Sequence, residues 1–338
     1  MTPSALAIRR TGPAWLCGAL AVGAALAAPA PARSANGKAP RSADVALGSR
    51  ARCAAYSGLP AGFRRDELAG MVWIEGGRFV PGSEDGYAEE RPRAPVDVEG
   101  FWIDRTEVTN AQFAAFVEAT GYVTLAERRG GSAVFRVPTA EELARTRHAW
   151  RYEPKASWRK PDASASARTP RPHEPVVHVA YEDALAYARW LGRELPSEAQ
   201  WEFAARARGG DHALDGPPRD AKGRAAANTW QGDFPLVNRA EDGFASRAPV
   251  GCFPGNPLGL FDMIGNVWEW TRDPSPTSPD EAPVPGAPVA RVIKGGSFLC
   301  APTHCARFRA SARQFQDEDL PTSHIGFRTV KSGPRPAR

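Results

Sequence analysis

Glycine and proline interrupt this sequence throughout, each occurring 32 times in 338 residues, and ten tryptophans are spread among them. Proline removes a backbone donor and glycine is costly to order, so both shorten regular helices and strands. The composition therefore argues against a helical bundle and predicts a loop-rich fold packed around aromatic anchors. Short strand patterns together with a few helical ones assign the chain to the α+β class.

The first 34 residues have the pattern of an export signal. Two arginines, Arg9 and Arg10, precede an apolar stretch from Trp15 to Ala28, and small residues follow at a suitable cleavage position. That stretch is too short and too rich in alanine to favour a permanent membrane span. We therefore expect an exported protein, periplasmic or secreted, with no stable membrane association.

The remainder of the chain divides into a short lead-in and one domain. Residues 35–65 are rich in small and basic residues without periodicity and are predicted to be flexible. Residues 66–334 are long enough to bury a substantial core as a single domain. Removal of the signal takes away three arginines and no acids, which lowers the formal net charge from +5 to +2. No basic run interleaved with aromatic residues occurs, so a nucleic-acid partner is not expected.

Several regular elements follow from local patterns. Residues 72–74 and 78–80 are predicted to form a hairpin around Gly76–Gly77, followed by strands at 96–98 and 101–104. Helices are predicted from a Thr109–Gln112 capping box to Gly121, over Tyr181–Leu191, and from Ser197 to just before Gly209. Residues 154–172 and 274–290 are expected to be exposed loops.

The cysteines are few and unevenly placed. Cys17 lies in the signal, which leaves Cys53, Cys252, Cys300 and Cys305. An even number in an oxidising compartment favours pairing. Cys300 and Cys305, with four residues between them, could form a disulfide or act as two soft ligands of one metal ion. If these two act together, Cys53 and Cys252 remain as a structural bridge; other pairings, and two purely structural disulfides, stay open.

Five segments of the chain resemble the formylglycine-generating enzyme, or sulfatase-modifying factor, family. They are residues 100–110, 195–206, 228–235 and 265–270, and the double-cysteine run 294–309 with its closing motif at 326–328. Most of them occur across the superfamily and imply its variant of the C-type lectin-like fold, low in regular structure. Only the cysteine pair and the Trp230–Phe234 stretch point to the activity. Inactive paralogues, iron-dependent sulfoxide synthases and lectin-like binding modules share the fold, so fold alone does not give function.

The resemblance implies a copper-dependent oxidase. Such an enzyme uses O₂ to convert a cysteine of a client sulfatase, in a Cys-x-Pro-x-Arg-like motif, to Cα-formylglycine. Cys300 and Cys305 would bind Cu(I), a soft ion that prefers thiolates, and Ser297 would lie near the oxygen site. Three further residues would contact the substrate: Trp268 as an aromatic wall, His304, and Arg307, which could equally orient the second cysteine or form a structural ion pair.

This sequence departs from the usual pattern of the family at three positions. Ala301 and His304 stand where relatives usually have a histidine and a tyrosine, and His324 stands where an asparagine is common. Two histidines near two thiolates could tune copper or carry protons, or they could be ordinary loop residues. These changes bear on substrate preference and rate more than on the metal site.

The resemblance also implies two structural Ca²⁺ sites built from turns. Their side-chain and backbone oxygens would come from Asn228, Thr229, Asp242 and Phe244 at one site and from Asp262, Gly265, Val267 and Glu269 at the other. The carbonyls would be those of Thr229, Phe244, Gly265 and Val267. Oxygen-only ligands suit Ca²⁺, although acidic residues at such positions also cap turns for local reasons.

The alternative to an oxidase is a non-catalytic exported family member, a binding or accessory module with a structural Cys300–Cys305 disulfide. Other chemistries lack support in the sequence. His173 and His178 flank Pro175 without a third ligand at helical spacing, and neither a phosphate-binding loop nor a Gly-x-Ser-x-Gly motif occurs.

Overall fold

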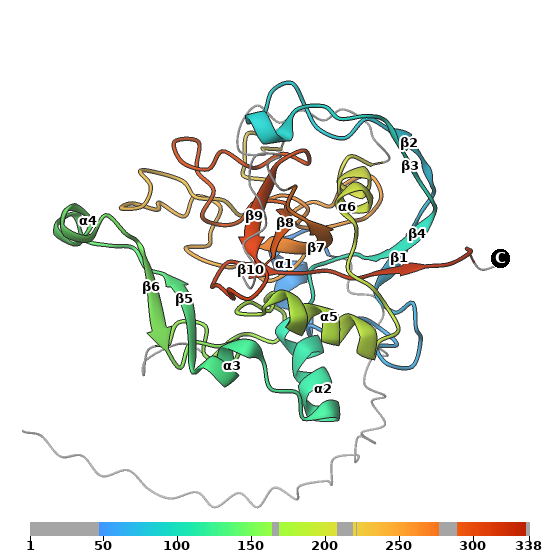
Figure 1. The fold of residues 1–338 in the computed structure, drawn as a ribbon, viewed down its shortest axis with the longest axis horizontal. Helices are drawn as coiled ribbons and strands as arrows, with labels where there is room; N and C mark the ends of the chain where they lie inside the picture. Colours follow the sequence, from blue (N-terminus) through green and yellow to red (C-terminus); the bar gives the residue numbers. More distant parts are fainter. Residues whose placement is uncertain (1–46, 164–168, 208–218, 221, 277–288, 336–338) are drawn as a thin grey trace, which may run out of the picture. The chain divides into compact units, whose positions relative to one another are not determined.

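The computed structural model describes residues 47–163, 169–207, 219–220, 222–276 and 289–335 (Figure 1). The predicted signal peptide lies outside the described residues. The helices are α1 (Arg50–Ala54), η1 (Ala88–Glu90), α2 (Asn110–Thr120), α3 (Leu125–Arg129), α4 (Ala140–Thr146), α5 (Tyr181–Trp190) and α6 (Glu198–Ala205). The strands are β1 (Met71–Ile74), β2 (Gly77–Phe79), β3 (Val96–Val98), β4 (Phe101–Asp104), β5 (Gly131–Phe135), β6 (Trp150–Pro154), β7 (Trp268–Pro274), β8 (Ala290–Lys294), β9 (Arg313–Asp317), β10 (Ile325–Gly326) and β11 (Val330–Ser332).

The strands form small sheets instead of one continuous layer. A three-stranded sheet has the order β1-β4-β11, and a four-stranded sheet has the order β10-β7-β8-β9. The pairs β2–β3 and β5–β6 stand as two-stranded ribbons. All pairings are antiparallel except the short β10–β7 contact. Short strands, short helices and long connections confirm the predicted α+β class with little regular structure.

Aromatic side chains form the core, as the composition predicts. Phe113 of α2 packs edge-on against Trp158 and stacks on Tyr187 of α5, with ring centroids 5.2 and 6.0 Å apart. A second cluster gathers around Trp201 of α6 and Phe203. Both indoles of the Trp268–Trp270 strand are buried against the first cluster. Large rings bury much apolar area per residue, which compensates for the small amount of regular structure.

The predicted hairpin around Gly76–Gly77 is wrong, although both strands exist. β1 pairs with β4 and β2 pairs with β3. Neither Gly76 nor Gly77 has the positive φ that a two-residue hairpin turn requires. A Cβ atom on Gly76 would lie 2.6 Å from the carbonyl oxygen of Val98, so this glycine is needed for the close approach of the opposite strand.

The predicted helices are present with small differences at their ends. Thr109 and Gln112 form the expected capping box of α2, and Gly121 ends it in the left-handed conformation at φ 69°. The helix predicted over Tyr181–Leu191 ends at Trp190. The helix capped by Ser197 ends at Ala205, earlier than expected, and Gly209 lies outside the described residues.

Two segments predicted to be flexible or exposed are anchored in the structure. Within the lead-in, residues 47–65 contain α1, and Cys53 forms a disulfide with Cys252. Within the loop predicted at 154–172, Ala156 and Trp158 are buried. A covalent bond in one case and an aromatic core contact in the other fix these segments, and neither appears as local periodicity. Among the described residues, no helix has both the length and the apolar character needed to cross a membrane.

Candidate active site

The turn that follows β8 brings Cys300 and Cys305 together. Gly296 has a φ of 75°, and a Cβ atom there would lie 3.4 Å from Cys300 Sγ and would clash with the Arg307 carbonyl. Ala301 and His304 then close the connecting loop with two backbone hydrogen bonds of 2.8 and 3.0 Å. As a result the two Sγ atoms lie 3.3 Å apart as free thiols. The structure thus holds the sulfurs close without joining them.

The two thiols differ in environment. Burial raises the pKa of Cys300 well above its usual value, and the neighbouring Cys305 raises it further. The hydrogen bond from Cys300 lowers the pKa of Cys305, against its partial burial, and the positive charge of Arg307 lowers it more. Burial thus favours the protonated thiol at Cys300, whereas the contacts with Cys300 and Arg307 favour the thiolate at Cys305. The Ser297 N–H also donates to Cys300 Sγ over 3.4 Å.

A cavity of about 330 Å³ opens onto the thiol pair. No Asp, Glu, Lys or Arg side chain is among the described residues that line it. They are Ala133, Trp150, Phe234, Trp268, Ser297, Leu299, Cys300, His304, Cys305, Gln314, Gln316, Leu320, Thr322 and His324. Aromatic walls around a partly open cavity fit an extended peptide segment that carries a side chain to the sulfurs.

The cavity brings together most of the residues predicted to act with the cysteines. Ser297 lies at its base and accepts a hydrogen bond from the Leu299 N–H at 3.2 Å. Trp268 lines one wall, and His304 stacks on Phe234 with ring centroids 4.2 Å apart. Two of the positions that depart from the family pattern, His304 and His324, therefore border the same space.

Arg307 is placed behind Cys305 and does not line this cavity. Its guanidinium binds Glu89 at 2.6 Å and Glu90 at 2.8 Å and lies 4.3 Å from the Tyr87 ring centroid. These contacts favour the predicted role in orienting the second cysteine over direct contact with a substrate. Glu89, Glu90 and Tyr87 were not predicted, because their segment lies over 200 residues away in sequence.

Other residues at the cavity were also missed by sequence reasoning. Trp150 belongs to β6, and its ring lies 4.7 Å from that of His324. Gln314 of β9 places Oε1 4.0 Å from Cys305 Sγ. Neither belongs to a recognisable motif. Phe234 could have been found, because it ends the Trp230–Phe234 stretch that the family resemblance singles out.

The first predicted calcium site has its ligands close together. Thr229 O and Asp242 Oδ2 both accept hydrogen bonds from the Gln231 side-chain amide, so these two oxygens face one point. Asn228 Oδ1 is buried and has no donor among the described residues. Burial also raises the pKa of Asp242. An acceptor without a donor beside a buried carboxylate fits a bound cation.

The second predicted site lies among buried acids. Asp262 accepts a hydrogen bond from the Gly251 N–H at 2.6 Å, and Glu269 accepts from Trp201 Nε1 at 2.8 Å and Arg328 Nε at 2.6 Å. Burial raises the pKa of Asp262 to about 6. Glu107, which was not predicted, is fully buried and its pKa is raised by burial, by Asp262 and by Glu269.

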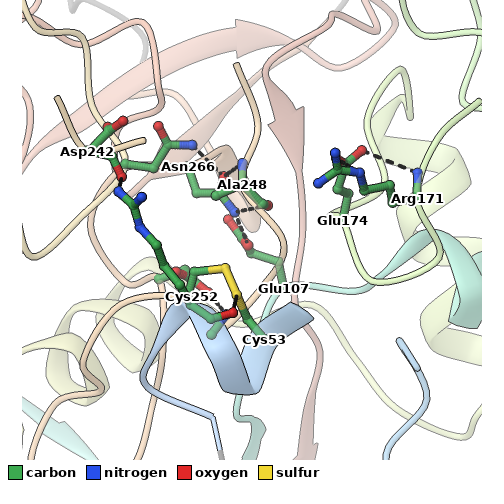
Figure 2. Close-up of a disulfide and its surroundings, with 12 residues drawn as sticks. Cys53, Glu107, Arg171, Glu174, Asp242, Ala248, Cys252 and Asn266 are labelled. Atoms are coloured by element: carbon green, nitrogen blue, oxygen red, sulfur yellow. Dashed lines mark hydrogen bonds and ion pairs between the residues drawn. A yellow bond between two sulfur atoms is a disulfide. The ribbon is translucent and has the colours of Figure 1, made fainter. Parts of the chain in front are cut away.

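Three interacting carboxylates face the single guanidinium of Arg328, so their charge is only partly balanced, and added positive charge fits the site. Figure 2 shows Glu107, Asn266 and Asp242 near the Cys53–Cys252 disulfide. In the described part of the chain, no three His, Cys, Asp or Glu side chains are grouped so that they could hold a metal on their own. Both calcium predictions therefore depend on backbone oxygens in addition to side chains.

Comparison with known proteins identifies the family. Residues 56–333 match the family model described as the sulfatase-modifying factor enzyme 1-like domain. The chain belongs to this family. The matched region begins ten residues before the domain start predicted at residue 66 and ends one residue before its predicted end.

Relatives within the sulfatase-modifying factor family are similar over nearly their whole lengths. The chain is 45% identical to the formylglycine-generating enzyme of Mycobacterium tuberculosis, over 78% of this chain and 98% of that protein. It is 46% identical to the one from Streptomyces coelicolor, over 77% and 88%. It is also 39% identical to the inactive Cα-formylglycine-generating enzyme 2 of Mus musculus, over 79% and 87%. Family membership therefore includes both active and inactive relatives.

A solved structure gives the same fold. PvdO from Pseudomonas aeruginosa has a TM-score of 0.54 and 25% identity, and the match covers 77% of this chain and 93% of that one. The mixed architecture with little regular structure is therefore that of the sulfatase-modifying factor family, as the resemblance implied.

Proposed function

We propose that this protein is a formylglycine-generating enzyme that activates sulfatases by converting a peptidyl cysteine to Cα-formylglycine. The free Cys300–Cys305 pair, with its sulfurs 3.3 Å apart in a cavity with aromatic walls, is the observation that carries the proposal. A structural disulfide between these residues would leave no thiol available. The curated active relatives support the same reaction.

The proposed reaction balances when O₂ is the oxidant and a thiol-type reductant supplies two electrons. The client carbon loses two electrons and one hydrogen as its C–S bond is replaced by C=O, and the sulfur leaves as hydrogen sulfide. Oxygen accepts these two electrons and two from the reductant, so that one oxygen atom enters the aldehyde and the other becomes water. The cavity leaves room for the client cysteine next to Cys305, the thiol of the pair whose pKa is lowered.

The pair fits Cu(I). Thiolate sulfur is the ligand type that Cu(I) prefers, and Cys300 and Cys305 would hold the ion, leaving a place for the client sulfur. When bound, copper supplies the one-electron and O₂ chemistry that side chains lack. The chain's own residues do the rest: Ser297 fixes Cys300 through its N–H, Arg307 favours the thiolate at Cys305, and Trp268 and Phe234 exclude water.

The direct test uses a peptide with a Cys-x-Pro-x-Arg sequence and mass spectrometry to detect thiol-to-aldehyde conversion. The Cys300→Ser variant should lose both Cu(I) uptake and product, because one of its two soft ligands becomes a hydroxyl. The Cys53→Ala/Cys252→Ala double variant, assayed at low temperature, is the control, since it removes the other two cysteines of the described chain and leaves both cavity thiols. Wild-type protein that binds the peptide and leaves its mass unchanged would place this chain with the inactive relatives, as an accessory module.

We also propose two structural Ca²⁺ ions at the Asp242 and Asp262 sites. The orphaned Asn228 oxygen and the excess of buried carboxylates support this. Chelation with EGTA should lower the melting temperature, and added Ca²⁺ should restore it. Asp242→Asn and Asp262→Asn should each reduce the number of ions found by elemental analysis by one. An unchanged melting temperature and no bound calcium would contradict the assignment.

Export to the periplasm or beyond is proposed from the signal-like N-terminus, and the Cys53–Cys252 disulfide supports it, because such bonds persist in oxidising compartments. The partner would be a sulfatase-type client that still exposes its cysteine segment. Cell fractionation checks the compartment, and finding the mature chain only in the reducing cytosol would contradict it.

A further inference from the structure

The β5–β6 ribbon has a sheet edge without a partner strand. β5 pairs with β6 on one side and forms a bridge between Ala133 and Thr322 on the other. β6 is the outer strand of the ribbon, and none of the described residues pairs with its other side (Figure 1). An exposed strand edge presents a row of N–H and C=O groups that can bind an extended chain.

The register shows which backbone groups face this edge. Arg136 N–H donates to Ala149 O at 2.9 Å, and Lys155 N–H donates to Gly130 O at 2.8 Å. Antiparallel pairs alternate between hydrogen-bonded and non-hydrogen-bonded, so residues 149, 151, 153 and 155 direct their backbone groups toward β5. The N–H and C=O groups of Trp150 and Tyr152 therefore point outward.

Pro154 supports this geometry independently. It has the same parity as Trp150 and Tyr152, so its missing N–H falls on the outer edge. Proline within a sheet is confined to positions whose N–H would face away from the ladder. The free edge therefore offers complete donor–acceptor pairs at two residues, Trp150 and Tyr152, and ends at the proline.

This edge is continuous with the candidate active site. The Trp150 side chain lines the cavity of the thiol pair, together with Ala133 of β5. Trp150 and Tyr152 are nevertheless 37% and 57% exposed. A chain paired with β6 would thus run beside the cavity mouth, a few residues of extended backbone from the sulfurs.

We propose that an extended segment of the client polypeptide, flanking its target cysteine, adds to the outer edge of β6 by backbone hydrogen bonds at Trp150 and Tyr152. The proposal rests on the proposed function, because it takes the client to be the occupant of the cavity. Backbone pairing binds without regard to side-chain identity, so it suits an enzyme that must hold different unfolded segments around one short motif.

Two other arrangements are less well supported. β9 also borders the cavity, but the Arg313 carbonyl on its outer edge already accepts a hydrogen bond from Arg307. A second copy of this chain could pair edge to edge. However, the edge adjoins the thiol cavity, which a client segment must enter and a second copy need not.

The protein-side test compares Tyr152→Pro with Tyr152→Ala. Proline removes the outward N–H and leaves the β5 ladder intact, as Pro154 already does, whereas alanine removes only the side chain. Loss of one backbone hydrogen bond changes an equilibrium by about two- to tenfold. Tyr152→Pro should therefore weaken binding of a 15- to 20-residue client peptide by about that factor more than Tyr152→Ala does, with kcat retained. Far-UV circular dichroism and melting temperature check that both variants fold.

The peptide-side test leaves the protein unchanged. Single N-methyl groups placed along the flanking segment should weaken binding, measured by fluorescence anisotropy, with a period of two residues, because alternate N–H groups face β6. N-methylation of the peptide residue opposite Tyr152 should cost less affinity in Tyr152→Pro than in the wild type. Both changes remove backbone hydrogen bonds between Tyr152 and that same peptide residue.

The outcomes separate this inference from the proposed function. A period-two pattern in binding supports edge pairing even if no aldehyde forms, in which case only the proposed activity fails. Normal conversion with no periodic effect and equal affinity of the two Tyr152 variants would overturn edge pairing and leave the activity standing. A concentration-dependent dimer by sedimentation that Tyr152→Pro makes monomeric would also overturn it, because the edge would then be occupied by a second copy.

Discussion

Cys300 and Cys305 are separated by four residues, yet they have opposite environments. Cys300 is 1% exposed and its pKa is raised by burial, whereas the pKa of the partly exposed Cys305 is lowered by the hydrogen bond from Cys300 and by Arg307. A thiol whose pKa is lowered, next to one whose pKa is raised, gives the pair an unequal reactivity.

Alkylation of the metal-free protein tests this inequality. At pH 7 iodoacetamide should label Cys305 first and Cys300 slowly, because the thiolate is the nucleophile and only Cys305 is accessible. In Cys300→Ala, labelling of Cys305 at pH 7 should slow severalfold, since the hydrogen bond that lowers the pKa of Cys305 is lost. Site-resolved mass spectrometry over pH 5 to 9 measures both rates; equal labelling of the two sites would contradict the assignment.

His178 shows a second consequence of burial. Its ring nitrogens lie 2.8 Å from Ser132 Oγ and from Pro161 O, and burial, helped by Arg247, lowers its pKa from 6.5 to about 3. Between pH 6.5 and about pH 3, His178 therefore binds a proton in the unfolded chain but not in the folded chain. The contribution of His178 to stability is present above pH 6.5 and is lost as the pH falls toward 3.

Urea unfolding at several pH values checks this dependence. Between pH 7 and 4 the stability of the wild type should fall relative to that of His178→Gln, by at most about 1.4 kcal/mol per pH unit. His148→Gln is the control, because that side chain is exposed. The prediction would be contradicted if the difference in free energy of unfolding between the wild type and His178→Gln did not vary with pH.

At the scale of elements, η1 and its flanks act as a support for the cysteine loop. Glu90 is 1% exposed and binds both Arg307 and Arg309, and the Tyr87 hydroxyl accepts a hydrogen bond from the Ala306 N–H at 3.3 Å. Glu198 and Glu202 of α6 extend the same kind of ion pairing to Arg313 and Lys294. Segments far apart in sequence are thus joined behind the thiol pair.

Glu90→Gln and Glu89→Gln form a matched pair for this support. Glu90→Gln should lower the free energy of unfolding by about 3 kcal/mol, because it leaves buried guanidinium charge without its counter-ion. Glu89→Gln should cost at most about 1 kcal/mol, since the Glu89 side chain is 34% exposed and its ion pair is partly screened. Chemical denaturation measures both values, and equal losses would contradict the proposed difference.

The elements also show which features of the fold can be predicted from the sequence. Capping boxes at Thr109 and Ser197 act within four residues, so both helix starts were predictable. The Gly76–Gly77 pair was misread because its role is a close approach to Val98, a contact across strands. At the site, motif spacing predicted Cys300, Cys305 and Ser297, whereas Trp150 reaches the cavity only through the β5–β6 ribbon, which carries no motif.

For the whole molecule, the Cys53–Cys252 bridge joins residues 199 positions apart. From the sequence, Cys53 and Cys252 were the two cysteines left over once Cys300 and Cys305 were taken together. Their pairing could not be established from sequence, because the contact between them depends on the fold. Cross-linking so long a loop restricts the unfolded chain far more than a short one does. The bridge therefore joins α1, which precedes the predicted domain, to the part of the domain that contains Cys252.

Replacing both bridge cysteines by alanine should lower the free energy of unfolding by about 4 to 5 kcal/mol, the value expected for a loop of this length. The cavity residues are contributed by other segments, so peptide conversion at low temperature should persist in the folded fraction. Urea unfolding with and without reductant provides the measurement. A double variant as stable as the wild type would show that the bridge is dispensable.

Pro154 has one further consequence. Exposed ribbons of this kind are where identical molecules begin to stack into fibres, since each new strand regenerates the template for the next. Here the proline ends the row of free N–H groups after Tyr152, and the charged Arg151 and Glu153 on the same strand disfavour stacking. The ribbon can thus bind an extended client segment transiently without promoting aggregation of the protein itself.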